Sequence, residues 1–147
     1  MFVAQYPYPV RGGLEKQAHE LVKELLKQAV TVRVLSGVVN DESPGAYTVE
    51  NVPVYRFPWP KTKLQRALFS TWYILAYLYF NRSHFDLVHS HSVSWIGGLV
   101  VLVSKLLGKR VVMKLPGIGD SGVPGITKKP LGRLLLSIFL KVDAIAV

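Results

Sequence analysis

The 147-residue chain has no cysteine, only 9 acidic residues and no long uninterrupted apolar run. Without cysteine there is no disulfide framework, thiolate metal site or thiol nucleophile, which fits a reducing compartment and predicts a cytoplasmic protein. The most apolar segment, residues 67–80, is shorter than the roughly 20 residues of a usual membrane span, so it predicts a buried or interfacial helix. No secretory leader is visible, because no basic region followed by an apolar stretch opens the chain.

The charge that is present is mostly positive. The formal net charge is +9, which creates a field that attracts phosphate-bearing partners. Two groups of basic residues adjoin apolar segments: Lys61, Lys63, Arg66 and Arg82, and Lys128, Lys129 and Arg133. Basic rims beside apolar faces suit an anionic membrane surface better than a nucleic-acid groove, so no nucleic-acid partner is expected. The alternative is a solvated surface that aids solubility.

Apolar strands alternate with helical segments along the chain. The expected strands are residues 2–5, 30–35, 52–57, 87–89, 110–114 and 143–147, and the expected helices are residues 14–28, 63–81, 94–107 and 130–141. This alternation predicts one α/β domain with a doubly wound parallel sheet, a Rossmann-like arrangement. Residues 38–50 have the turn signals of a loop. Residues 144–147 have the pattern of a buried strand without a following cap, so we expect residues 1–147 to be a fragment of a longer protein.

Gly12 and Gly13 join the first expected strand to the first expected helix. Glycine lets the backbone N–H groups and the positive end of a helix dipole approach an anionic ligand, and a phosphate is the natural candidate. The alternative is that the pair only forms a tight turn.

Polar residues also follow the later strands: Ser36 and Gly37, then His89 to Ser92, then Gly117 to Asp120. In a doubly wound sheet, ligands bind at the carboxyl ends of the strands. These positions therefore predict a cleft at one edge of the sheet.

His89 and His91 are two residues apart at the end of a strand, so their side chains share one side. They could carry protons, hydrogen-bond a hydroxylated substrate or bind a metal. A His-x-His pair without a third ligand at a recognisable spacing is weak evidence for zinc, so we expect no metal site. One of the two could instead be hydrogen-bonded for structure only.

The segment from Lys114 to Asp120 brings together a cation, two glycines (Gly117 and Gly119) and a carboxylate. Lys114 could pair with a phosphate, and Asp120 could orient a sugar hydroxyl. The alternative is an ion pair between Lys114 and Asp120 that shapes the loop.

Three other residues carry weaker signals. His19 lies at the border of an apolar helical stripe and is expected to be half-exposed. His84 lies in a polar turn without a specific role. Trp59, between two prolines, is either a packing residue or a loop aromatic that touches a ligand.

Three sequence runs together resemble the amino-terminal domain of family 4 glycosyltransferases with the GT-B fold (glycosyltransferase group 1 type). They are P-V-R-G-G-L-E, F-D-L-V-H-S-H-S and G-K-R-V-V-M-K-L-P-G-I-G-D. They occur in the family's order over nearly the whole chain. Taken together they are fairly specific, although each run alone is not.

The resemblance implies that this chain supplies the acceptor side of a cleft and that an absent carboxyl-terminal domain holds most nucleotide-sugar contacts. It implies retaining, metal-independent hexosyl transfer to a sugar, lipid or other acceptor, without a cofactor and without activity in the isolated fragment. Gly12 and Gly13 would approach the donor diphosphate. The other site residues that it implies are His89, His91 and Ser92 on the acceptor side, and Lys114, Gly117, Gly119 and Asp120 beside the sugar.

One position departs from the family pattern. Many relatives have a histidine in the loop after the fifth strand, where this chain has Pro116. Some relatives have a K-x-x-G-x-G-D form there instead, so the change indicates a branch of the family. The catalytic residue is therefore unassigned, with His91 as the candidate.

Two other classes of function remain open. A Rossmann-like module that binds a peripheral membrane surface or a polyanion, without chemistry of its own, would share the fold and the charge. A dinucleotide-dependent oxidoreductase is disfavoured, because G-x-G-x-x-G is absent after the first strand.

Overall fold

The fold is a single seven-stranded sheet with helices on both faces. A computed structural model describes residues 2–3, 12–38, 43–58, 60, 62–91, 94–115 and 132–146. In chain order the strands are β1 (Phe2–Val3), β2 (Val34–Gly37), β3 (Gly45–Val49), β4 (Val52–Phe57), β5 (Leu87–Ser90), β6 (Arg110–Lys114) and β7 (Ala144–Ala146). The helices are α1 (Gly13–Lys27), α2 (Lys63–Phe80), the short 3₁₀ helix η1 (Arg82–His84), α3 (Trp95–Leu106) and α5 (Gly132–Phe139).

The strands lie in the order β3-β4-β2-β1-β5-β6-β7. Every pair is parallel except β3 with β4, which is antiparallel. The chain crosses from β2 and β4 on one side of β1 to β5 and β6 on the other. This confirms the predicted doubly wound α/β sheet, with an antiparallel strand added at one edge.

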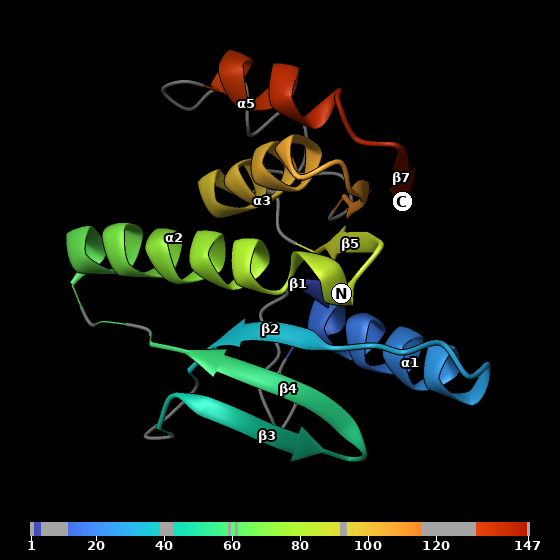
Figure 1. Cartoon of the computed structure of the whole chain (residues 1–147). Helices are drawn as coiled ribbons and strands as arrows, with labels where there is room; N and C mark the ends of the chain where they lie inside the picture. Colours follow the sequence, from blue (N-terminus) through green and yellow to red (C-terminus); the bar gives the residue numbers. More distant parts are fainter. Residues whose placement is uncertain are drawn as a thin grey trace.

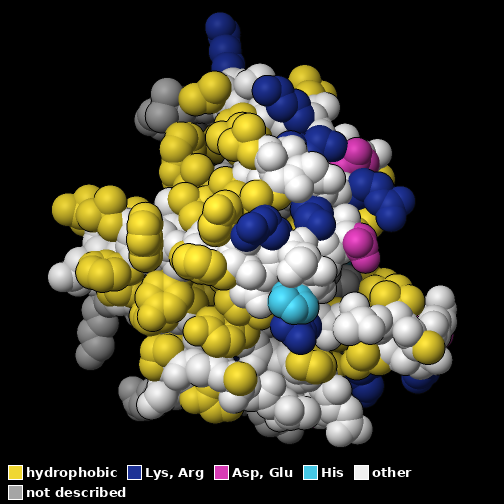
Figure 2. Space-filling view, in the orientation of Figure 1, with side chains coloured by type: hydrophobic (Ala, Val, Ile, Leu, Met, Phe, Trp, Pro, Cys, Tyr) yellow, Lys and Arg dark blue, Asp and Glu magenta, His cyan; other side chains and the backbone are white. Residues whose placement is uncertain are grey.

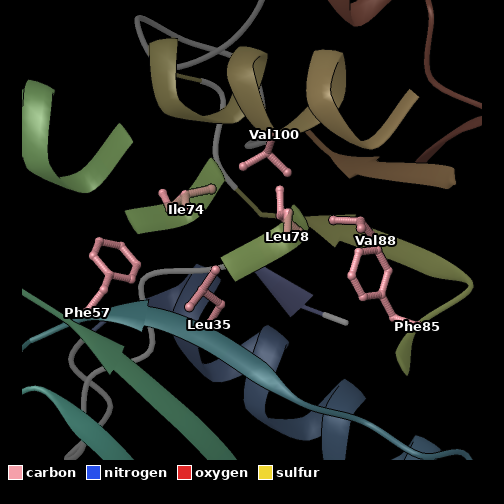
Figure 3. Close-up of a cluster of buried hydrophobic side chains, with 7 residues drawn as sticks. All are labelled: Leu35, Phe57, Ile74, Leu78, Phe85, Val88 and Val100. Carbon is pink, nitrogen blue, oxygen red and sulfur yellow. The ribbon is translucent and has the colours of Figure 1, made fainter. Parts of the chain in front are cut away.

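Different helices cover the two faces of the sheet. On one face, Ala18 and Val22 of α1 pack against Val34 and Val54 of the sheet. On the other face, α2, α3 and α5 lie side by side (Figure 1). Under α2 and α3 lies a buried cluster of Leu35, Phe57, Ile74, Leu78, Phe85, Val88 and Val100 (Figure 3). A further cluster under α3 and α5 contains Val101, Val111, Met113, Leu135 and Phe139.

The helices begin close to the predicted positions because the sequence carries their start signals. Thr62 Oγ1 accepts from the Gln65 N–H before α2, and Ser94 Oγ accepts from the Gly97 N–H before α3. Such caps satisfy N–H groups that have no acceptor within the helix. Among the described helices, none combines the length and the apolar character needed to cross a membrane.

Two predictions about the region before β4 were wrong. The expected loop at 38–50 contains β3, which pairs with β4 across a turn at Glu50 and Asn51, whose φ angles are 46° and 67°. Two successive positive φ angles are typical of the type I′ turn that joins tightly paired strands. The expected strand at 30–35 begins only at Val34, because the Val30 N–H donates to the Leu25 carbonyl and so closes the end of α1 (3.0 Å).

β7 is held at the sheet edge by Asp143. Its Oδ2 accepts from the Val111 N–H (2.6 Å) and its Oδ1 lies 2.8 Å from Lys105 Nζ of α3. The Lys105 ammonium and the Val111 N–H lower the pKa of Asp143. β7 itself was expected to be buried, but Ala144 and Ile145 are exposed, because the strand lies at the outer edge of the sheet.

Candidate functional site

Polar residues lie level with one another at the carboxyl ends of four strands. Ser36 and His91 each follow a residue that pairs with Val3 of β1, namely Leu35 and Ser90. Lys114 likewise follows Met113, which pairs with Ser90, and Arg56 of β4 pairs directly with Ser36. We refer to Arg56, Ser36, His91 and Lys114 as the polar row.

The polar row lies on the face of the sheet that α1 covers. Val34 and Val54 pack against α1, and Ser36 and Arg56 follow them by two residues, which returns the side chain to the same face. His89 is level with Val34, since both pair with Phe2. Because α1 follows β1 in a parallel sheet, its first turn starts at this same carboxyl edge.

His89 and His91 form a close pair of buried imidazoles. Their ring centroids lie 4.4 Å apart with an interplanar angle of 42°, which confirms that they share one side of the chain. Burial, together with the neighbouring positive charges of His91 and Lys114, lowers the pKa of His89 to about 4. Burial and the Lys114 charge also lower the pKa of His91 to about 4.

Both rings are therefore neutral at pH 7. A neutral imidazole donates one hydrogen bond and accepts another, which matches a sugar hydroxyl. Because a pKa near 4 makes a weak base, the geometry favours hydrogen bonding over proton abstraction by His91 at neutral pH.

Sequence reasoning missed Arg56. The side chain is fully buried, and its Nη1 donates to Ser36 Oγ at 3.4 Å. The signal was present, because the alternation of Val52, Val54 and Arg56 places an arginine on the inward side of a strand. A buried arginine near the carboxyl end of a strand supplies a fixed positive charge at the edge where ligands bind, since arginine stays protonated.

Gly12 and Gly13 lie at the start of α1. Gly12 is the extended residue before the helix (φ −133°, ψ 165°), and as a glycine it offers no side-chain cap to the first N–H groups of α1. Its carbonyl accepts from the Lys16 N–H at 3.0 Å. A β-carbon at Gly12 would meet the Glu15 carboxylate, whereas one at Gly13 would have none of the described heavy atoms within 4 Å. Among the described residues, Gly13 therefore has free space beside it at the positive end of the helix.

Several predicted positions lie outside the described residues: Ser92, Pro116, Gly117, Gly119, Asp120 and Trp59. Their proposed roles stay predictions. Within the ranges that the structure does describe, no group of three His, Asp or Glu side chains could hold a metal ion.

The prediction for His19 was wrong. It is buried, and its Nε2 lies 2.8 Å from Glu50 Oε2, in the turn between β3 and β4. The hydrogen bonds from His19 and Lys23 lower the pKa of Glu50. His19 therefore ties α1 to the β3–β4 hairpin and lies away from the polar row. His84 is exposed, beside Ser83.

A Rossmann-like sheet with a helix start and a polar row at its carboxyl edge defines the class of α/β domains that bind ligands at this edge. A family model described as "Glycosyl transferase 4-like domain" matches residues 12–141, so the chain belongs to this family. The resemblance to family 4 glycosyltransferases is thereby confirmed. A search of curated proteins found no match.

Solved glycosyltransferases share the fold. Sucrose-phosphate synthase from Thermosynechococcus elongatus is 11% identical, with a TM-score of 0.67 over 98% of this chain and 40% of its own. MurG from Acinetobacter baumannii is 15% identical, with a TM-score of 0.59 over 98% and 39%. An α,α-trehalose-phosphate synthase (UDP-forming) from Burkholderia xenovorans, in complex with glucose-6-phosphate, is 13% identical, with a TM-score of 0.61 over 98% and 38%. The chain thus spans about two fifths of the length of these proteins.

Proposed function

We propose that this chain is the acceptor-side domain of a retaining glycosyltransferase. The enzyme would move a hexose from a nucleotide-sugar donor to a sugar, lipid or other acceptor, without a metal ion or other cofactor. The isolated domain would be inactive, because a second domain would hold most of the donor. The location that we propose is the cytoplasm, at the inner face of the membrane.

The polar row is the observation that carries this proposal. Together with the neighbouring His89, it brings two neutral imidazoles near the cation of Lys114 at one edge of a domain from a glycosyltransferase family. Neutral imidazoles suit the hydroxyl groups of an acceptor, and Lys114 suits a phosphate. The sugar phosphate in the related trehalose-phosphate synthase structure is in keeping with such a ligand.

The donor diphosphate would lie at the start of α1. The space that the described residues leave beside Gly13 and the first backbone N–H groups of α1 would give an anion a place close to the helix axis. In that position the helix dipole and Lys114 would stabilise the negative charge of the leaving nucleotide. This is electrostatic stabilisation of the kind that lowers barriers without a protein nucleophile.

The test is nucleotide release by the full-length enzyme with UDP-, GDP- and ADP-sugars in turn, with and without EDTA. Release that depends on one donor and survives EDTA supports the proposal, and proton NMR of the product gives the anomeric configuration. His91→Ala is expected to raise the KM for the acceptor or to lower kcat, while His84→Ala serves as a control on an exposed histidine. An inverted product would contradict the retaining assignment, and wild-type kinetics in a folded His91→Ala enzyme would remove His91 from the site.

The second candidate is a module that binds a peripheral membrane surface or a polyanion and has no chemistry. The exposed apolar side chains of α2 and α3 favour it. Salt-sensitive binding to anionic vesicles by a protein that releases no nucleotide from any donor sugar would select this candidate over transfer.

A further inference from the structure

The helices that cover one face of the sheet are apolar on their outer sides as well as on their inner sides. In α2 the inner positions Ser70, Ile74 and Leu78 are buried. The outward stripe of the same helix begins with Leu64, Leu68 and Trp72, spaced four residues apart, and Leu64 and Trp72 are 72% and 71% exposed. A surface helix normally presents polar residues on that side.

The apolar outer stripe continues across the neighbouring helices. Because α2 packs beside α3 and α3 beside α5, their outward sides form one surface, which we call the outer helical face. Figure 2 shows apolar side chains running over α2 and α3. The exposed apolar residues of the outer helical face are Leu64, Leu68, Phe69, Trp72, Tyr79 and Phe80 from α2, Trp95, Leu102 and Leu106 from α3, Leu134 from α5, and Leu140 just after α5.

The charged side chains of these three helices are all basic. Within their described bounds, α2, α3 and α5 contain no aspartate or glutamate. Arg133 is exposed on α5, and Arg82, just after α2, lies 4.5 Å from the centre of the Tyr79 ring. A partner that covers this face must therefore accept large apolar side chains and also carry negative charge.

We propose that the outer helical face docks on the surface of an anionic lipid bilayer. Leucine and aromatic side chains would enter the boundary between headgroups and acyl chains, and arginine and lysine would reach the lipid phosphates. A second copy fits less well, because two faces of the same positive sign would meet. A nucleic acid fits less well, because its phosphates would leave the apolar side chains unmatched.

Docking requires only a lipid surface, so it is independent of the proposed sugar transfer. The test measures co-sedimentation of the full-length protein with vesicles of phosphatidylcholine and phosphatidylglycerol, and with phosphatidylcholine alone, in the absence of any nucleotide sugar. We expect strong binding to the anionic vesicles, weaker binding to the neutral ones, and a loss of binding as the salt concentration rises.

Variants separate the apolar from the electrostatic contribution. The double variant Leu68→Gln/Trp72→Gln is expected to lower the vesicle partition coefficient roughly tenfold or more, because two large apolar side chains are removed from the contact. Arg133→Gln is expected to lower it about fivefold, the contribution of one basic side chain near an anionic surface. Leu21→Gln, an exposed apolar residue of α1 on the opposite face, is the matched control and should bind as the wild type does.

Circular dichroism and thermal unfolding establish that each variant is folded, which is expected because these side chains are exposed. Three results would overturn the proposal. The first is a folded double variant that binds vesicles as well as the wild type does, and the second is a wild-type protein that does not bind anionic vesicles. The third is a wild-type protein that light scattering shows to be a dimer without lipid, with a monomeric double variant. The last result would assign the outer helical face to a second copy. A wild-type protein that binds anionic vesicles but releases no nucleotide from any donor sugar would count against the proposed enzyme and not against the docking proposal.

Discussion

The imidazole rings of His89 and His91 lie 4.4 Å apart, both of them buried at the carboxyl end of β5. Two such rings cannot both hold a proton cheaply, because each cation would be desolvated and would face the other as well as Lys114. Protonation of this pair at low pH should therefore destabilise the folded state.

The free energy of unfolding is expected to fall as the pH is lowered from about 6.5 to about 4. In the unfolded chain His89 and His91 bind protons near pH 6.5, whereas in the folded chain they do so only near pH 4. Between these pH values the unfolded state binds protons that the folded state does not. The free energy of unfolding therefore falls by roughly 3 kcal/mol for each of these two histidines. Urea unfolding across this pH range measures the slope.

The variant His91→Gln should reduce that slope, because one of the two titrating groups is removed. His84→Gln, at an exposed histidine, should leave the slope unchanged. Equal slopes in His91→Gln and the wild type would show that the pair does not cause the acid sensitivity.

The turn at Glu50 and Asn51 predicts opposite effects for two substitutions of the same residue. Asn51 has φ 67°, a conformation that glycine adopts freely and a β-branched residue adopts only with strain. Asn51→Gly should leave the free energy of unfolding unchanged or raise it slightly, and Asn51→Val should lower it by about 1 to 2 kcal/mol. Thermal unfolding of both variants checks the turn, and a tolerated valine would argue against the positive φ.

Gly98 marks a close approach of α3 and α5. A β-carbon at this position would lie 2.8 Å from Leu135 Cδ2 and 3.7 Å from Phe139 Cε1. Gly98→Val should therefore lower the free energy of unfolding by roughly 1 to 3 kcal/mol, because buried side chains must move. Leu106→Val in the same helix, at a residue that is 78% exposed, is the control and should cost little.

Gly13→Val tests the donor side of the site. Within the part of the chain that the structure describes, no heavy atom lies within 4 Å of a β-carbon at Gly13, so the variant should fold, while its side chain fills the space beside the first turn of α1. Nucleotide release by the full-length enzyme is expected to fall at least tenfold, since a blocked phosphate loses more than about 1.4 kcal/mol. Lys16→Val, one turn further along α1, should release nucleotide at close to the wild-type rate. Unchanged turnover in Gly13→Val would place the diphosphate elsewhere.

Local signals in the sequence predicted the helices and most of the parallel strands. Apolar residues at helical spacing define their helices without reference to the rest of the chain. The sharing of one side by His89 and His91 follows from strand alternation alone. Once β5 and β6 are taken as parallel neighbours, the placement of Lys114 at the same edge follows as well.

The misses depended on contacts between distant residues. β3 was hidden because its turn lacks the glycine that usually announces a tight hairpin, and Glu50 and Asn51 adopt positive φ instead. His19 is buried only because Glu50, 31 positions away, comes to lie beside it. Arg56 was read as part of an apolar strand, although its alternation with Val52 and Val54 placed it inward.

Asp143, the residue just before β7, contacts two other elements through one side chain: the Val111 N–H of β6 and the Lys105 ammonium of α3. Protonation of this carboxylate at low pH should weaken the attachment of β7 to β6. The N–H and C=O groups on that edge of β6 would then be exposed and could pair with another strand. A second molecule can supply one, so aggregation through newly opened sheet edges is the hazard to expect when this protein is handled or stored in acid.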